Sequence, residues 1–316
     1  MLLTNGRAVR AGIIAAVPLA CLIAVHAQAQ TTLRWNLKPG ERFGYTIRQN
    51  AVTTMNLNKM TITTKLNQTT DMTWHVKAVD NTGKAEIAQT IDRIRLKAEG
   101  GPVGVIEYDS KEAKKPKGPA EQALGTMLGA MVGAEFTMKI DPHGDVSDVK
   151  IPEKMTTMLK NMPGAARLGD LFSEEGIKRL TGASGFVLPK TAVSKGQTWT
   201  NEAQMKMPFG LVRANNEFTY QGPAKHDGRD TQKIGIKTAL SLEPAPGGKI
   251  QFKVTSTDAQ GATYFDNVAG RVLESDMTQN LAMQFNVVGS STEQEVHTSV
   301  SVNMKLADRP AADKTN

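Results

Sequence analysis

The sequence predicts a mainly β fold with a helical insertion, an α+β arrangement of two similar curved antiparallel sheets or half-barrels. Three observations support this prediction. Apolar and polar residues alternate over many segments, helical spacing is confined to the region around 120–180, and several segments recur in the same order in both halves. Alternation with period two places the apolar side chains of a strand on one face of a sheet.

Residues 1–29 have the character of a secretory signal peptide. Arg7 and Arg10 precede the apolar run Ala11 to Val25, and Ala27-Gln28-Ala29 is a small-x-small site suited to signal peptidase. We expect cleavage after Ala29, because the apolar run is shorter than the roughly 20 residues that a membrane-spanning helix needs. The protein is therefore expected to be exported, either periplasmic or extracellular.

Two alternatives to cleavage after Ala29 remain at the N-terminus. The apolar run could stay as an uncleaved membrane anchor, or Cys21 could be acylated as in a lipoprotein. Pro18 and the apolar residues that continue beyond Cys21 argue against acylation. Cys21 is the single cysteine of the chain, so a mature protein that begins after Ala29 has no disulfide, thiol nucleophile or zinc thiolate.

The first β half is expected at 30–118. In its first strand Phe43, Tyr45 and Ile47 share one face, which is typical of a half-buried antiparallel strand. A second strand, Met72 to Val79, leads into the turn Asp80-Asn81-Thr82-Gly83, where Asn and Gly supply the positive φ values that a tight hairpin needs.

Residues 119–185 are expected to form a helical connector or cover that includes one strand at 136–140. Ala120 to Val132 has apolar residues at helical spacing, a second helix is expected from Pro152 through Leu159, and a third from Ser173. The glycines at 125, 129 and 133 resemble a membrane helix-packing motif, but the apolar span is too short to cross a bilayer.

The second β half is expected at 186–306, followed by a polar, disordered tail at 307–316. Its last strand, Val296 to Val302, alternates clearly. The strands expected in this half are Glu217 to Gln221, Thr231 to Leu242, Lys249 to Asp258, Ala262 to Asn267, Arg271 to Phe285 and Gln294 to Leu306.

Three pairs of segments indicate an internal duplication. Leu37 to Phe43 aligns with Val193 to Trp199, matching Gly40 to Gly196. Further on, Thr73 through Gly83 parallels Phe218 through Gly228, and Gly144-Asp145-Val146 parallels Gly270-Arg271-Val272.

The Trp-x-Leu-Lys-x-Gly-Glu-x-Phe-x-Tyr segment from Trp35 to Tyr45, the Lys-Gly-x-x-Trp segment from Lys195 to Trp199 and the signal peptide together resemble a family of exported bacterial proteins of unknown function. The resemblance implies a β-dominated exported protein. It implies no catalytic residue, because these motifs consist of structural glycines and aromatic residues.

Charge and motifs exclude several classes of function. The formal charge of +7 is a mild excess, and the basic stretch Lys111 to Lys117 has no interleaved aromatic residue, so a nucleic-acid partner is not expected. The loop Asp141 to Asp148 holds three carboxylates and His143, but Asp-Pro-x-Gly favours a type I turn over a calcium site. We therefore expect no metal, no cofactor and no catalytic residue.

The sequence therefore favours a non-catalytic exported protein that holds a lipid or other apolar ligand between sheet and helix. The expected ligand-binding residues are Leu124, Met127, Leu128 and Met131, and Met127→Glu should abolish binding. The alternative is a structural or interaction protein of the cell envelope, whose partner is another envelope protein. A hydrolase is the weaker alternative, and it would need Asp141, His143 or His75 to meet another carboxylate in a cleft.

Overall fold

The computed structural model describes residues 30–57, 60–101, 104–112, 116, 118–153, 155, 157, 186–207, 210–245, 250–287 and 293–307. The expected signal peptide, the third helix, most of the second helix and nearly all of the tail lie outside these residues. The elements are β1 (Arg42–Leu57), β2 (Met60–Val79), β3 (Ala85–Gly100), β4 (Val105–Asp109), α1 (Pro119–Met131), β5 (Glu135–Ile140), β6 (Val146–Lys150), β7 (Thr198–Met207), β8 (Gly210–His226), β9 (Arg229–Pro244), β10 (Ile250–Asp266), β11 (Arg271–Val287) and β12 (Glu293–Leu306).

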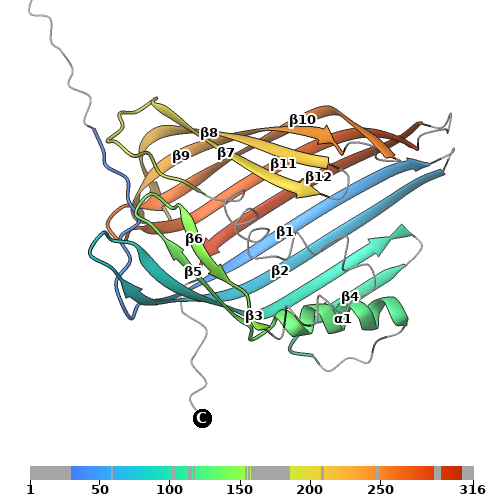
Figure 1. Ribbon diagram of the computed structural model, residues 1–316, viewed down its shortest axis with the longest axis horizontal. Coiled ribbons are helices and arrows are strands. Elements are labelled where there is room, and N and C mark those ends of the chain that lie inside the picture. The colour runs from blue at the N-terminus through green and yellow to red at the C-terminus, as the bar shows by residue number, and fades with distance from the viewer. Residues whose placement is uncertain are drawn as a thin grey trace, which may run out of the picture.

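All of the described strands belong to one curved, antiparallel sheet (Figure 1). Its order is β6-β5-β3-β2-β1-β12-β11-β10-β9-β8-β7, and β4 pairs with β3 off this path. The mainly β class is confirmed. The two expected halves are not separate sheets, because β1 and β12 pair from Tyr45↔Leu306 to Asn56↔Glu295 and join them edge to edge.

The two halves repeat the same succession of hairpins. In the first half β1 pairs with β2, β2 with β3, β3 with β5 and β5 with β6. In the second half β7 pairs with β8, β8 with β9, β9 with β10 and β10 with β11. The strand β12 is additional and lies between the two sets.

The turns that open the two halves are built alike. Gly40 has a φ of 82° and donates to the Val76 carbonyl, and Gly196 has a φ of 90° and donates to the Tyr220 carbonyl. In each turn the side chain that follows the glycine accepts a backbone hydrogen bond. The Glu41 carboxylate accepts from the Lys38 amide, and the Gln197 side-chain oxygen accepts from the Ser194 amide. This correspondence matches the sequence alignment of Gly40 with Gly196.

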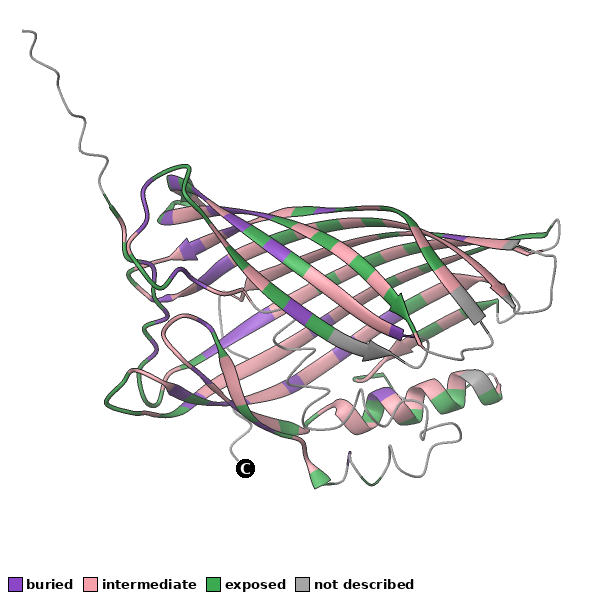
Figure 2. Cartoon of the chain, turned by 45° about the horizontal axis from the view of Figure 1, so that its top comes forward, coloured by how far each residue is buried: buried purple, intermediate pink, exposed green. Residues whose placement is uncertain are grey.

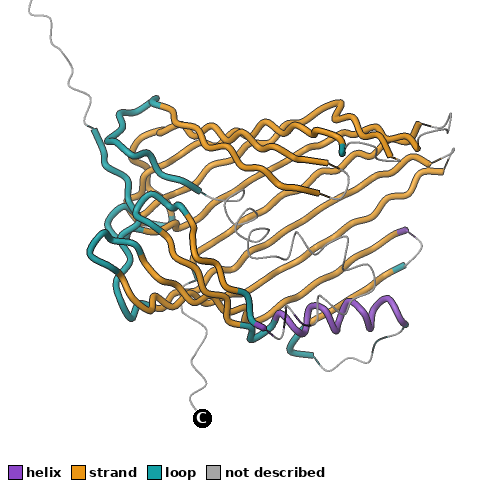
Figure 3. Tube along the Cα trace, viewed as in Figure 1, coloured by secondary structure: helices purple, strands orange, loops and turns teal. Residues whose placement is uncertain are grey.

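Two irregular segments, residues 30–41 and 186–197, run into β1 and β7 and cross at one end of the sheet, which we call the entry end. They pair with each other where Thr31 and Val193 exchange backbone hydrogen bonds. The opposite end, where β1 and β3 finish, we call the far end. Figure 3 shows loops gathered at the entry end.

The main core lies at the entry end, on the concave side of the sheet. It joins side chains from strands that lie far apart in the strand order, such as Met138 of β5 and Phe218 of β8, which can meet only across the concave side. Figure 2 shows buried residues alternating with exposed ones along the strands. Tyr45, Phe265 and Val272 are at most 1% exposed.

The helix α1 covers β3 and β4 on the same side of the sheet. Pro119 fits the first turn because its missing N–H needs no partner there, and Glu121 is favourable near the helix N-terminus. The chain leaves the helix through Gly133, which has a φ of 75° and donates to the Ile91 carbonyl. No described helix combines the length and the apolar character that crossing a bilayer demands.

Candidate functional site

The strand register separates an apolar concave face from a polar convex face. Toward the far end, one row across five neighbouring strands carries aliphatic side chains on the concave face: Ile62, Met55, Val296, Met283 and Val254. The adjacent row, on the convex face, is polar throughout: Thr61, Asn56, Glu295, Gln284 and Lys253. Neighbouring residues of each row are register partners on adjacent strands. At this level of the sheet, the two faces therefore differ in chemistry across all five strands.

Toward the entry end, the next concave row holds Leu281 and four threonines, which are Thr64, Thr53, Thr298 and Thr257. Apolar side chains return in the rows beyond it, with Ala51 opposite Leu66 and Val300, and Val302 opposite Met277. Most of these side chains are half-buried, whereas their convex neighbours are mostly exposed. We call this set, from Ile62 and Val254 inward to Met277 and Val302, the concave apolar face.

Some polar side chains on the concave side are paired with each other, whereas the buried Thr257 hydroxyl has no partner within the described residues. The Thr53 and Thr298 hydroxyls lie 3.3 Å apart, and the Thr263 and Ser275 hydroxyls lie 2.8 Å apart. The aliphatic and methionine side chains of this surface, although interrupted by hydroxyl and amide groups, have the chemistry of a site for an apolar molecule.

The four ligand-binding residues expected from the sequence lie on α1, where it packs against β3. Leu128 is 5% exposed and belongs to a small cluster with Ile91, Ile94 and Leu96. Leu124, Met127 and Met131 are partly buried against the same cluster. These side chains therefore fix the helix to one wall of the concave side, and their contact with a ligand stays a prediction.

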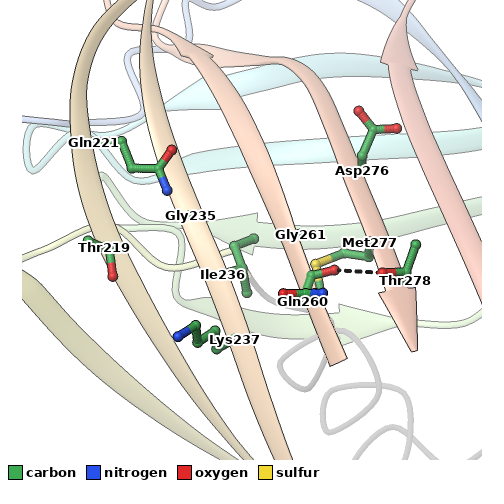
Figure 4. A pocket seen from close by; sticks show the side chains of 10 residues that line it. All are labelled: Thr219, Gln221, Gly235, Ile236, Lys237, Gln260, Gly261, Asp276, Met277 and Thr278. Atoms are coloured by element: carbon green, nitrogen blue, oxygen red, sulfur yellow. Dashed lines mark hydrogen bonds between the residues drawn. The ribbon is translucent and has the colours of Figure 1, made fainter. Parts of the chain in front are cut away.

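A hollow of about 360 Å³ lies on the convex face over β8 to β11 (Figure 4). It opens because Gly235 and Ala262 face each other in the row from Thr219 to Asp276 and leave little side-chain volume there. Lys237 and Asp276 line it together with amide and hydroxyl groups. These groups do not form a set of converging acids or bases, so the hollow has no evident catalytic chemistry.

Within the described residues, His226, Asp227 and Glu274 form a group of histidine and carboxylate side chains close enough to share a metal ion. His226 Nε2 is 2.7 Å from Glu274 Oε2, and the His226 ring stacks on Tyr264 with centroids 3.9 Å apart. Lys305 Nζ lies 2.6 Å from Asp227 and 3.2 Å from Glu274. The ammonium group of Lys305 therefore contacts both of the carboxylates that a metal ion would use.

Sequence reasoning did not find this group. The sequence His226-Asp227-Gly228 is typical of a turn. The structure has this turn between β8 and β9, with a φ of 48° at Asp227. Glu274 comes from β11, 48 residues further along the chain. Only the pairing of β9, β10 and β11 brings it close, and no local spacing signals that.

The acidic loop that begins at Asp141 is a turn in the structure, as its sequence favours. The Asp141 carboxylate accepts backbone hydrogen bonds from His143 at 2.8 Å and Asp145 at 2.9 Å, and its carbonyl accepts from Gly144. His143 Nδ1 is 3.8 Å from Asp141, too far for a hydrogen bond. The Asp141 carboxylate therefore stabilises the turn by accepting these backbone hydrogen bonds.

Comparison with solved structures finds distant likenesses. A lipovitellin structure, titled for its lipid–protein interactions, has a TM-score of 0.48 at 12% identity; the match covers 88% of this chain and 26% of that one. A DUF1329 family protein from Desulfovibrio piger has a TM-score of 0.15 at 11% identity, with 85% and 88% covered. DynF from Micromonospora chersina has a TM-score of 0.20 at 9% identity, with 95% and 92% covered. This chain thus spans about a quarter of the lipovitellin chain, and with TM-scores below 0.5 none of these likenesses bears on function.

Comparison with curated proteins returns no match. A family of unknown function matches residues 82–293, which include the Lys195 to Trp199 segment and the strands β3 to β11, but not β1, β2 or the Trp35 to Tyr45 segment. The expected resemblance to an uncharacterised family is thereby confirmed: the chain belongs to DUF6263, a family of unknown function.

Proposed function

We propose that this protein is an exported, non-catalytic carrier that holds a lipid or a similar apolar molecule against the concave apolar face. The observation that carries the proposal is the aliphatic row from Ile62 to Val254, set against the polar row on the opposite side of the same strands. A sheet that only had to remain soluble would not need an apolar row of this extent beyond its main core.

The dimensions of the face suit an elongated ligand. Neighbouring strands lie about 4.8 Å apart, so five strands span about 19 Å. Burying apolar surface contributes about 25 cal/mol per Å², which makes contact with a row of aliphatic side chains favourable without any directed polar group. Methionines such as Met55 and Met283 adapt their shape readily, which favours tolerance for ligands of varied shape over strict selection of one.

The test is native mass spectrometry of the protein purified from its host's envelope, followed by solvent extraction of bound molecules. We expect an apolar adduct at one stoichiometric ratio. Met283→Glu should lower the adduct at least tenfold, because a carboxylate on the concave face would lose its hydration without gaining a partner. Thr278→Glu is the matched control, since Thr278 is exposed on the convex face of the same strand and its substitution should leave the adduct unchanged.

Circular dichroism must show that both variants keep the strand content of the wild type. A clean apo mass for the wild-type protein would refute the carrier proposal and direct attention to protein partners in the envelope. Equal loss of the adduct in both variants would also contradict it, because the effect would then not depend on the face that carries the charge.

A further inference from the structure

Two neighbouring rows of the concave face carry uncharged hydroxyl and amide groups. The outer row, next to the aliphatic row, holds Leu281 and the four threonines Thr64, Thr53, Thr298 and Thr257. The row beyond it runs through Asn216, Thr238, Ala259, Gln279 and Val300. We call the hydroxyl and amide groups of these two rows the neutral polar band.

The neutral polar band lies between two apolar zones. Toward the far end it is followed by the aliphatic row, in which Met283 and Val254 lie opposite each other. Toward the entry end it is followed by a row that contains Phe218 opposite Ile236, both of which belong to the main core. A molecule that lies along the strands on the concave face therefore meets apolar, neutral polar and again apolar side chains.

The concave face combines these rows without any ionised group. In the described parts of β1, β2 and β8 to β12, every side chain that the register places on this face between the aliphatic row and Met277 is apolar or neutral. The convex face of the same strands carries charged side chains such as Lys65, Lys237 and Asp276. The two faces thus differ in charge as well as in polarity, and the concave one suits an uncharged molecule.

The Thr257 hydroxyl gives the most specific indication of what such a molecule must contain. Its Oγ1 atom is buried and has no hydrogen-bond partner within the described residues. A buried hydroxyl without a partner destabilises a fold, because it gives up its hydrogen bonds to water and replaces none of them. An acceptor on a bound molecule would remove this cost.

Other hydroxyl groups of the band keep hydrogen-bonding capacity beyond their contacts with each other. The Thr53 and Thr298 hydroxyls lie 3.3 Å apart, and only one of their two hydrogens can lie between them, so the other hydroxyl can donate elsewhere. The Thr238 hydroxyl donates to Asn216 Oδ1 at 2.7 Å, and Asn216 is only 7% exposed. The band therefore offers hydroxyl donors to a ligand that brings neutral acceptors.

We propose that the cargo of the concave apolar face is an uncharged acyl ester, such as a diacylglycerol, with its ester carbonyls at the neutral polar band and its acyl chains on the apolar zones. This inference rests on the proposed carrier function and names its substrate class. Ester carbonyls accept hydrogen bonds from hydroxyl groups, and acyl chains bury apolar surface against aliphatic side chains.

Two other classes of lipid fit the neutral polar band less well. An ionised phosphate or carboxylate would lose its hydration there without meeting a cation among the described concave residues. A pure hydrocarbon would cover the Thr257 hydroxyl and give it no partner. Sites that hydrogen-bond a ligand discriminate against analogues without the bonding group for this reason.

The experiment compares three probes for binding to the full mature protein after its bound lipid has been removed. Dioleoylglycerol is the expected ligand class, dioleoyl phosphatidic acid adds one ionised phosphate to it, and squalene is a hydrocarbon of similar bulk without polar groups. The probe that stays bound through gel filtration is extracted and measured by mass spectrometry. We expect the wild type to retain at least ten times more dioleoylglycerol than either of the other probes.

Variants then test the role of the hydroxyl groups. Thr257→Val, which replaces the hydroxyl by a methyl group, should lower bound dioleoylglycerol about tenfold and change bound squalene less than twofold. Thr53→Val combined with Thr298→Val should act in the same direction, and it removes both partners of one contact, so that no unpaired group remains. The matched control is Ser256→Ala, which removes an exposed hydroxyl from the convex face of β10 and should change neither probe.

Three outcomes would overturn the proposed substrate class while leaving the carrier proposal intact: equal retention of dioleoylglycerol and squalene, a preference for phosphatidic acid, or an unchanged preference in a folded Thr257→Val protein. If the wild type binds none of the probes and leaves its host with a clean apo mass, the carrier proposal is refuted and the substrate class with it. The comparison of probes on the wild type decides the proposal even where a variant does not fold.

Discussion

His226 Nε2 lies 2.7 Å from Glu274 Oε2 and ties the β8 to β9 turn to the centre of the sheet. Burial pushes the pKa of Glu274 upward, but hydrogen bonds from His226, Asn303 and Lys305 outweigh it, and the resulting pKa is below the ordinary value. A carboxyl whose pKa is lower in the folded state stabilises the fold above its unfolded pKa and loses that contribution as the pH falls through the folded pKa.

Thermal unfolding should therefore show a falling melting temperature as the pH drops below the ordinary glutamate pKa of about 4.3. Glu274→Gln should be less stable at pH 7 and should lose less stability on acidification. Parallel melting curves for the two proteins between pH 7 and pH 3 would contradict this account of Glu274.

Tyr45→Phe should lower the free energy of unfolding by about 1 to 2 kcal/mol, because it leaves the buried Val272 carbonyl without its partner. The Tyr45 hydroxyl donates to that carbonyl at 2.9 Å, and Tyr45 is 1% exposed. Burial raises the pKa of Tyr45 well above its ordinary value, which keeps the hydroxyl protonated as a donor.

Denaturant titration measures this loss, with Tyr264→Phe as the control. The Tyr264 ring stacks on His226, and its hydroxyl makes no hydrogen bond within the described residues. Equal stability of the two variants would show that the buried hydrogen bond of Tyr45 contributes nothing.

Gly261→Ala should destabilise the protein strongly, because the added Cβ would clash with the Asp276 carbonyl oxygen of the neighbouring strand. The backbone there cannot shift without breaking the pairing of β10 with β11. Gly125→Ala is the opposite case, since in α1 its Cβ would make ordinary contact with the Tyr108 ring at 3.7 Å.

Replacing a helical glycine by alanine stabilises a helix by about 1 kcal/mol. The melting temperature should thus fall for Gly261→Ala and rise slightly for Gly125→Ala. A rise in both would mean that the close approach of β10 and β11 is absent in solution.

Gly40→Ala and Gly196→Ala should cost similar free energies, about 1 to 2 kcal/mol each, because both residues have the left-handed conformation and neither Cβ would meet another atom. Backbone strain alone then sets the cost. Chemical denaturation of the two variants measures it, and costs that differ severalfold would show that the two turns are not equivalent in energy.

Alternation in the sequence predicted where strands lie but not how long they are. Phe43, Tyr45 and Ile47 mark the start of β1. The strand nevertheless continues to Leu57 through a stretch, including Thr53 and Thr54, in which both faces carry polar residues, so the alternation of apolar and polar residues is hidden. Lys249 to Asp258 and Ala262 to Asn267 were expected as two strands and are one, β10, because Gly261 is accommodated within the ladder.

The joining of the two halves was not predictable from local pattern. Backbone hydrogen bonds between β1 and β12 carry no residue-specific signal, since any two strand edges of suitable length can pair. The contact of Glu274 with His226 was equally unpredictable, because it depends on the order of the strands β8 to β11 in the sheet. In contrast, the helix expected at Ala120 to Val132 agrees closely with α1, because proline, glutamate and apolar spacing are local signals.

The pairing of β1 with β12 also constrains when the fold can be completed. Thr53 and Thr298 face each other although 245 residues separate them, so this seam closes only after almost the whole chain is available. A chain crossing a membrane from its N-terminus would present β1 with one edge unpaired until β12 emerged. Because distant pairings form slowly, the hairpins of each half are expected to form first and the seam last. During that interval β1 is the strand most in need of protection from aggregation.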